Sequence, residues 1–148
     1  MNLLSKYEPD PTNLLMILHD YQNHNEQNQI TRENLVEIAD YLNISYSWVC
    51  GVATYYSMFS IKPRGRHIIR ICNSPVCNME GAEPVLERLQ SLLGVGVGET
   101  TDDGLFTIEH TECLGRCASA PMMMVDEELL GGITADNLGT IIEEFRRR

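Results

Sequence analysis

Residues 67–77 read His67-Ile68-Ile69-Arg70-Ile71-Cys72-Asn73-Ser74-Pro75-Val76-Cys77, an apolar run that leads into a Cys-x4-Cys pair. A second run, residues 105–112, leads into Cys113-Leu114-Gly115-Arg116-Cys117, which is a Cys-x3-Cys pair. If the two runs are neighbouring parallel strands, both pairs leave the sheet at the same end, where the ligand sites of such sheets lie. The pattern therefore predicts one site built from four thiols.

Three kinds of chemistry fit four cysteines in this spacing. Four thiolates can bind a [2Fe-2S] cluster, and the arrangement favours this interpretation. Structural zinc also takes four cysteines, but its ligand pairs usually lie in compact knuckles, whereas a helix and a strand are expected between these pairs. Redox-active or structural thiols are the third alternative, although disulfides are rare in cytosolic proteins. The candidate metal and cofactor ligands are Cys72, Cys77, Cys113 and Cys117.

Charge and hydropathy limit the partners and the compartment. The 148 residues carry a formal net charge of −10, which would repel a phosphate backbone, so no nucleic-acid partner is expected. The N-terminus lacks the basic region and the apolar stretch of a signal peptide. No apolar run approaches the roughly 20 residues that a membrane helix needs. These features predict a soluble, cytoplasmic protein without direct membrane insertion.

Helical periodicity dominates the first part of the chain. Asp10-Pro11 is a typical helix start, and caps at Thr31 and Ser45 predict two further helices, of which the first ends near Asn43. Amphipathic helices of this length need a surface to pack against. We expect a helical subdomain over residues 1–62, with a role in docking a partner.

From residue 63 onward the pattern changes to strands. The predicted elements follow the order β-α-β-β-β-α. They are strand 67–72, helix 79–93, strands 105–112, 121–125 and 128–133, and helix 135–146, whose N-cap is Thr134. A strand–helix–strand unit makes its two strands parallel. The fold class is therefore α+β: a helical subdomain is followed, over residues 63–148, by an α/β domain.

Motifs beyond the cysteines point to a known family. The segment Glu112-Cys113-Leu114-Gly115-Arg116-Cys117-Ala118-Ser119-Ala120-Pro121, together with the Cys-x4-Cys pair, resembles the thioredoxin-like [2Fe-2S] subunit of NADH dehydrogenases, the 24-kDa or E-type subunit of complex I. The stretches 51–59, 62–65 and 98–107 are similar to the segments that precede the two pairs in that family. The resemblance extends from about residue 12 to the C-terminus.

The resemblance implies a thioredoxin-like domain with a mixed four-stranded sheet and one [2Fe-2S] cluster on the four cysteines. It also implies a partner subunit that binds FMN and NADH, and a larger iron–sulfur or hydrogenase subunit. Related subunits occur in NAD-linked and electron-bifurcating hydrogenases. The chain has no long extension after its final helix, which favours a hydrogenase-type or bifurcating complex over a membrane respiratory one.

Several other residues have a structural interpretation. Cys50 is expected to be a buried, inert thiol within its helix. Trp48, Tyr55 and Tyr56 are expected to be core residues more than recognition residues, although part of this aromatic surface could contact the flavin subunit.

The polar residues of the first cysteine loop, Asn73, Ser74 and Asn78, could donate hydrogen bonds to sulfur. Arg116 is either a group that stabilises the reduced cluster or a solvated surface charge. Gly94-x-Gly-x-Gly98 follows a helix and not a strand, so it does not predict a nucleotide site.

The predicted function is that of an electron-transfer subunit that exchanges single electrons with the FMN of its partner. No catalytic residues are expected in the chain itself, because it offers no candidate acid–base pair and no Cys-x2-Cys redox motif. Two rival hypotheses remain: a zinc-stabilised or metal-free structural adaptor, and a stand-alone ferredoxin-like carrier.

Overall fold

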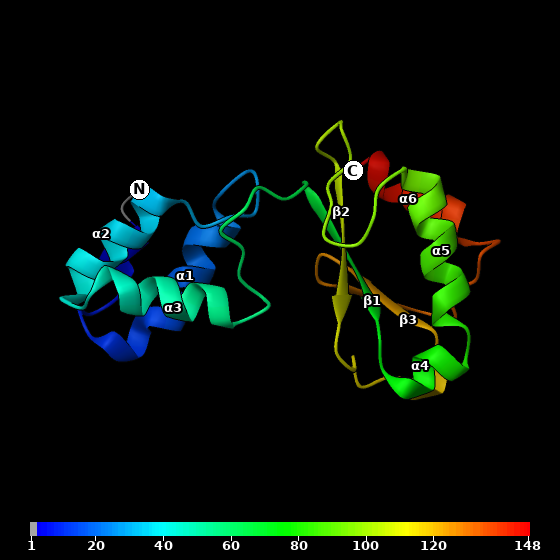
Figure 1. Ribbon diagram of the computed structural model, residues 1–148, viewed down its shortest axis with the longest axis horizontal. Coiled ribbons are helices and arrows are strands. Elements are labelled where there is room, and N and C mark those ends of the chain that lie inside the picture. Colours follow the sequence, from blue (N-terminus) through cyan, green and yellow to red (C-terminus); the bar gives the residue numbers. More distant parts are fainter. Residues whose placement is uncertain (1–2) are drawn as a thin grey trace. The chain divides into compact units, whose positions relative to one another are not determined.

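The computed structural model describes residues 3–148; Met1 and Asn2, with which the expected helical subdomain begins, lie outside the described residues. The chain forms two compact units, one ending at Arg64 and the other running from Gly65 to Arg148. Figure 1 shows helices in the first unit and a sheet with helices in the second.

The first unit contains the helices α1 (Leu14–Asn23), α2 (Arg32–Leu42) and α3 (Tyr46–Tyr55), preceded by the 3-10 turns η1 (Leu3–Lys6) and η2 (Pro11–Asn13). The caps predicted at Thr31 and Ser45 are confirmed. Thr31 and Asn34 form a reciprocal capping box at the start of α2, and the left-handed Asn43 ends that helix. Ser45 accepts a hydrogen bond from the backbone N–H of Trp48 and begins α3.

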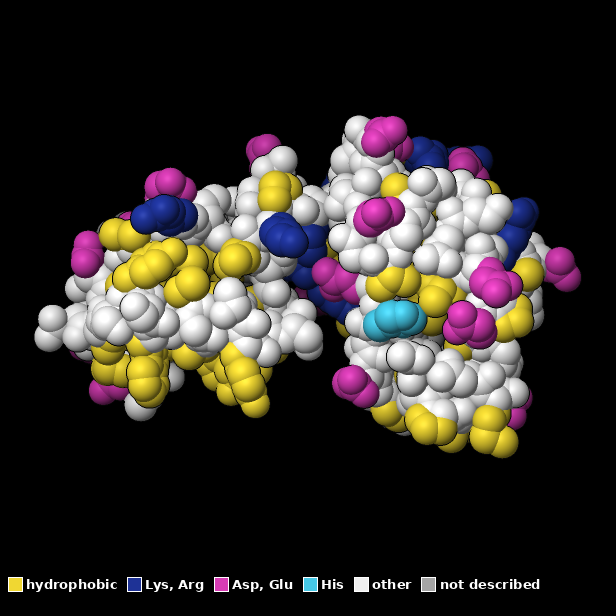
Figure 2. Space-filling model, in the orientation of Figure 1, with side chains coloured by type: hydrophobic (Ala, Val, Ile, Leu, Met, Phe, Trp, Pro, Cys, Tyr) yellow, Lys and Arg dark blue, Asp and Glu magenta, His cyan; other side chains and the backbone are white. Residues whose placement is uncertain are grey.

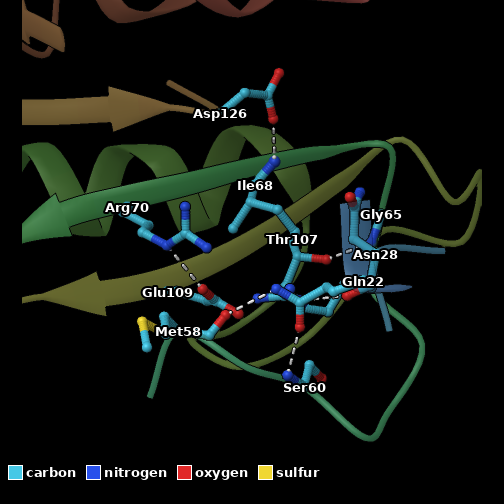
Figure 3. A network of polar contacts seen from close by, with 11 residues as sticks. Gln22, Asn28, Met58, Ser60, Gly65, Ile68, Arg70, Thr107, Glu109 and Asp126 are labelled. Carbon is cyan, nitrogen blue, oxygen red and sulfur yellow. Dashed lines mark hydrogen bonds and ion pairs between the residues drawn. The ribbon is translucent and has the colours of Figure 1, made fainter. Parts of the chain in front are cut away.

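A buried glutamine holds the chain that follows α3 against α1. Gln22 is 5% exposed. Its side-chain amide donates to the carbonyl of Met58 (2.9 Å), and its Oε1 accepts from the N–H of Ser60 (2.8 Å), as Figure 3 shows. Ile17, Ile38 and other apolar residues of this unit pack into a core of their own. The amide nitrogen and the amide oxygen of Gln22 each have a hydrogen-bond partner, so this polar side chain can be buried beside the core.

The expectation that the aromatic residues of α3 lie in the core is wrong. Trp48 is 64% exposed and Tyr55 is 81% exposed, while Tyr56 is exposed to a smaller degree. The buried face of α3 consists of Val49 and Ala53, which are one turn apart. The helix packs through this narrow stripe, and its aromatic residues remain on the open side.

The second unit is a mixed four-stranded sheet with helices, which confirms the predicted α+β fold class. Its strands are β1 (His67–Cys72), β2 (Phe106–Thr111), β3 (Met122–Val125) and β4 (Glu128–Gly131), arranged in the order β2-β1-β3-β4. β1 and β2 are parallel, as predicted, and β3 is antiparallel to both β1 and β4. The helices α5 (Ala82–Leu93) and α6 (Leu138–Arg146) contact each other beside the sheet (Figure 1).

The two faces of β1 and β2 differ in chemistry. One face contributes Ile69, Phe106 and Ile108, all fully buried, to a core that also contains Leu89 of α5. The other face carries an ion pair between Arg70 Nε and Glu109 Oε2 (3.1 Å), which are directly paired across the strands (Figure 3). The helices cover the apolar face because only that face removes a large hydrophobic area from water.

The expected helix 79–93 starts three residues later than predicted, and a separate short helix that the sequence pattern did not predict precedes it. A short helix, α4 (Pro75–Met79), lies within the first cysteine loop, and α5 begins only at Ala82. Pro75 occupies the first turn of α4, where its missing N–H costs nothing. Gly81, with φ +97, turns the chain between the two helices in a conformation that other residues rarely adopt.

Candidate metal centre

The two cysteine pairs lie at one end of the parallel strands. Cys72 is the last residue of β1 and is paired in register with Thr111, the last residue of β2. Cys77 lies in α4. Cys113 follows two residues after Thr111, and Cys117 begins the short 3-10 turn η3 (Cys117–Ser119). Both loops therefore begin at the same end of the sheet, at the carboxyl ends of β1 and β2, as the order of elements predicts.

The first pair is buried. Cys72 and Cys77 are each 1% exposed. The Cys72 sulfur lies 3.3 Å from the Ser74 hydroxyl oxygen, and the backbone N–H of Leu114, which belongs to the second cysteine loop, is close enough to help lower the pKa of Cys72. The backbone N–H of Met122, the first residue of β3, lies near the Cys77 thiol and acts to lower its pKa. The second loop and the strand after it thus approach the first pair.

The second pair is exposed. The sulfur atoms of Cys113 and Cys117 lie 3.9 Å apart, and the backbone N–H of Gly115 donates to the Cys113 sulfur (3.4 Å). Gly115 has φ +76, a left-handed conformation that turns the chain between the two cysteines. The loop needs glycine here, because most other residues would be strained in this conformation.

The surroundings of the thiols shift their pKa values in different directions. Burial raises the pKa of Cys72, but the Ser74 hydroxyl and the backbone N–H groups of Ser74 and Leu114 favour the thiolate more strongly, and the net pKa is lowered. Burial raises the pKa of Cys77, and the neighbouring Cys72 raises it further. The adjacent Cys113 raises the pKa of Cys117. Cys72 is therefore the buried thiol that most readily supplies a thiolate, the form that binds metal.

The four thiols form two pairs. Among residues 3–148, no group of three or more His, Cys, Asp or Glu side chains is arranged to hold a metal ion. A [2Fe-2S] cluster contains two irons and takes four cysteine thiolates. One buried pair and one exposed pair, with backbone N–H groups directed at the sulfurs, fit such a cluster. Cys72, Cys77, Cys113 and Cys117 could hold it.

The structure assigns different roles to the other polar residues of these loops. Ser74 is the one of the three expected side-chain donors that lies beside a sulfur. The amide of Asn78 donates to the side-chain oxygen of Asn73 (3.1 Å), so this pair closes the loop and does not serve the sulfur. Arg116 is exposed. Cys50, partly buried against the core of the helical unit, belongs to the other unit.

Sequence reasoning missed two contributions to this site. The N–H groups of Leu114 and Met122 are backbone donors whose roles depend on how the loops approach, and no side-chain pattern reports them. The second contribution is Gly131 of β4, because a Cβ there would lie 2.7 Å from the Cβ of Ser119 and 2.9 Å from its carbonyl oxygen. Ser119 ends η3, which Cys117 begins, so Gly131 provides the space that this turn occupies.

No helix among the described residues 3–148 is long and apolar enough to cross a membrane.

The sequence of the chain is similar to those of known proteins. The family model for thioredoxin-like [2Fe-2S] ferredoxins matches residues 1–146. The E-type subunit of the NADH-quinone oxidoreductase of Pseudomonas aeruginosa is 44% identical over 108 residues, which cover 73% of this chain and 65% of that protein. The corresponding protein of Escherichia coli is 41% identical over 109 residues, covering 74% of this chain and 66% of the relative. The chain matches less than two thirds of the length of these relatives.

Among solved structures, an NAD+-reducing [NiFe]-hydrogenase in the air-oxidised state superposes with a TM-score of 0.80 at 19% sequence identity. The match covers 91% of this chain and 23% of the hydrogenase chain. At this identity the similarity establishes the fold alone, and it extends over both units of the chain.

Proposed function

The chain belongs to the thioredoxin-like [2Fe-2S] ferredoxin family, whose cofactor is a [2Fe-2S] cluster, and we propose that it is an electron-transfer subunit that binds this cluster through Cys72, Cys77, Cys113 and Cys117. The observation that carries the proposal is the meeting of the two cysteine loops, in which the backbone N–H of Leu114 lies near the Cys72 sulfur. A cluster of this kind supplies one-electron chemistry. The protein contributes four thiolates and the N–H donors that stabilise their negative charge.

The partner that this proposal requires is a flavin subunit. The relatives are subunits of NADH-quinone oxidoreductases, and the superposed structure is an NAD+-reducing hydrogenase. We assign this chain to a complex of either kind, in which a neighbouring subunit binds FMN and NADH and exchanges single electrons with this cluster. The described residues of the chain contain the electron carrier, and the hydride chemistry belongs to the partner.

A surface suited to the partner lies beside the cluster loops. In α4, Val76 is 43% exposed and Met79 is 86% exposed, on either side of the buried Cys77. Figure 2 shows hydrophobic side chains at the end of the second unit where Figure 1 places α4. An exposed apolar rim next to a redox site excludes water when it is covered, and it permits close approach of the electron donor. We therefore place the electron-exchange contact at α4.

The helical unit offers a second docking surface. Residues 41–61 contain no charged side chain, although the chain as a whole carries a net charge of −10. The two most exposed aromatic residues of α3, Trp48 and Tyr55, lie two turns apart on one side of the helix and form a stripe with the exposed Gly51 between them. Uncharged surfaces rich in Trp and Tyr are typical of interface cores. Figure 2 shows hydrophobic side chains projecting beside α3. We assign this stripe to docking of a partner subunit.

Purification from the native host tests the partnership. The chain is expected to elute with a flavoprotein that releases FMN on acid treatment, and NADH is expected to reduce the [2Fe-2S] cluster in that complex but not in the isolated chain. A chain that elutes alone, with a cluster unaffected by NADH, would indicate a free ferredoxin-like carrier. Colourless protein containing zinc in place of iron and sulfide would indicate a structural adaptor.

A pair of variants tests the docking surface. Trp48→Ala is expected to weaken the complex by about thirtyfold or more, since a buried interface tryptophan contributes about 2 kcal/mol or more. Val36→Ala removes a side chain that is 43% exposed on α2 and is the matched control, with little expected effect. Equal affinities for the two variants would exclude α3 from the interface.

A further inference from the structure

Ser74 occupies a helix-capping position but does not use its hydroxyl as a cap. It is the N-cap residue of α4, with the extended backbone typical of that position (φ −79, ψ 156), yet its side chain accepts no hydrogen bond from the helix. The other serine N-cap, Ser45, accepts the N–H of Trp48 in the usual way (3.2 Å). The hydroxyl of Ser74 therefore does not cap α4 and is available to another partner in the first cysteine loop.

The hydroxyl of Ser74 faces the sulfur of Cys72. The two atoms lie 3.3 Å apart, within reach of a hydrogen bond to sulfur, and Cys72 is 1% exposed. When Cys72 is a thiolate it accepts hydrogen bonds only, so the hydroxyl of Ser74 is then the donor. Asn73 and Asn78, the neighbouring polar residues, are bonded to each other, and Ser74 is the side chain of this loop that serves the sulfur.

A donor at this position acts on the charge of the cluster. Reduction adds one electron and makes the cluster and its thiolates more negative, and a hydrogen bond to a ligand sulfur stabilises the more negative state. Hydrogen bonds to the sulfurs are among the factors that set the potentials of iron–sulfur clusters. The effect is strong where water does not compete, and the burial of Cys72 provides such an environment.

We propose that Ser74 is a tuning residue, whose hydroxyl raises the reduction potential of the cluster by donating a hydrogen bond to the Cys72 thiolate. The proposal rests on the proposed function, in that Cys72 must be a ligand. The proposal predicts that the hydroxyl determines the shift in reduction potential, and that the shape of the side chain and its effect on helix stability do not.

The test is a redox titration of the holoprotein with dithionite, followed by EPR of the reduced cluster. Ser74→Ala is expected to move the midpoint potential to a more negative value while the content of iron and sulfide stays that of the wild type. Ser74→Thr and Ser74→Val have nearly the same shape and differ in the hydroxyl. The threonine variant is expected to keep the wild-type potential, and the valine variant is expected to match the alanine variant. This pair decides the question if the alanine variant does not retain its cluster.

Ser45→Ala is the matched control for capping. It removes a hydroxyl that does cap a helix, so it is expected to lower the melting temperature and leave the potential unchanged. Equal potentials in Ser74→Thr and Ser74→Val, or an equal shift in Ser45→Ala, would overturn the inference. A separate arm tests its premise: Cys72→Ser is expected to change the EPR g values, and unchanged g values would remove Cys72 from the ligand set whatever the Ser74 variants show.

Discussion

Gly131→Ala tests whether β4 positions the second cysteine loop. The added Cβ would lie 2.7 Å from the Cβ of Ser119, 2.9 Å from the carbonyl oxygen of Ser119 and 2.9 Å from the sulfur of Met122. The methionine sulfur can move at small cost. The Ser119 carbonyl cannot, because it is backbone and accepts a hydrogen bond from the N–H of Gly132 (2.7 Å). The turn η3 must therefore shift.

The expected cost of this shift follows from overpacking. Extra methyl or methylene groups in a packed site destabilise by roughly 1–3 kcal/mol. In a unit of this size each kcal/mol corresponds to about 4–8 °C in melting temperature. We expect Gly131→Ala to melt several degrees or more below the wild type. Because Cys117 begins the turn that moves, we also expect faster bleaching of the visible absorbance when an iron chelator is added.

Two variants make the interpretation specific. Gly139→Ala places a methyl group in α6, where nothing lies within 4 Å, and is expected to melt at or slightly above the wild-type temperature. Ser119→Gly in the Gly131→Ala background removes the nearest contact and is expected to recover part of the loss. Wild-type stability and wild-type cluster lifetime in Gly131→Ala would refute the claim that this contact positions the loop.

Three further predictions concern the cores and the charges. Leu89→Ala, at a fully buried position, should lower the free energy of unfolding by about 2–5 kcal/mol in a denaturant titration, and a loss below 1 kcal/mol would contradict its place in the core. Cys50→Ala should retain the visible and EPR spectra of the cluster, whereas a bleached protein would make Cys50 a ligand. The Lys6 ammonium and the Tyr7 hydroxyl hold the pKa of Asp20 below its usual value. The resulting stability is present above the unfolded pKa of about 3.9 and is lost as the pH falls through the lower folded pKa. Asp20→Asn should therefore melt below the wild type at pH 7, and this difference should shrink with acidification; a constant difference would contradict the ion pair.

The local signals in the sequence predicted much of the fold, because caps and strands are local features. Thr31 and Ser45 satisfy the free N–H groups at the starts of their helices, whatever the rest of the chain does. The run 67–72 is β-branched and apolar, and it forms β1 with those bounds. The family resemblance supplied the mixed sheet, which periodicity alone does not specify.

The features that the sequence did not predict depend on tertiary contacts. An apolar helical stripe has the same pattern whether it faces a core or a partner, and for this reason the sequence predicts Trp48 and Tyr55 in the core although both are exposed. The start of α5 shifted because Gly81 adopts a left-handed conformation that no periodicity reveals. Backbone donors such as Leu114 have no side-chain signature at all.

The most direct test of the account uses EPR of the dithionite-reduced protein, prepared without oxygen, together with measured iron and sulfide. The wild type and Cys50→Ala are expected to contain two irons and two sulfides per chain and to give one [2Fe-2S] signal. Alanine variants of Cys72, Cys77, Cys113 and Cys117 are each expected to lose that signal. A wild-type protein without inorganic sulfide, or a full signal in any one of the four variants, would contradict the claim that both cysteine loops hold a single two-iron cluster.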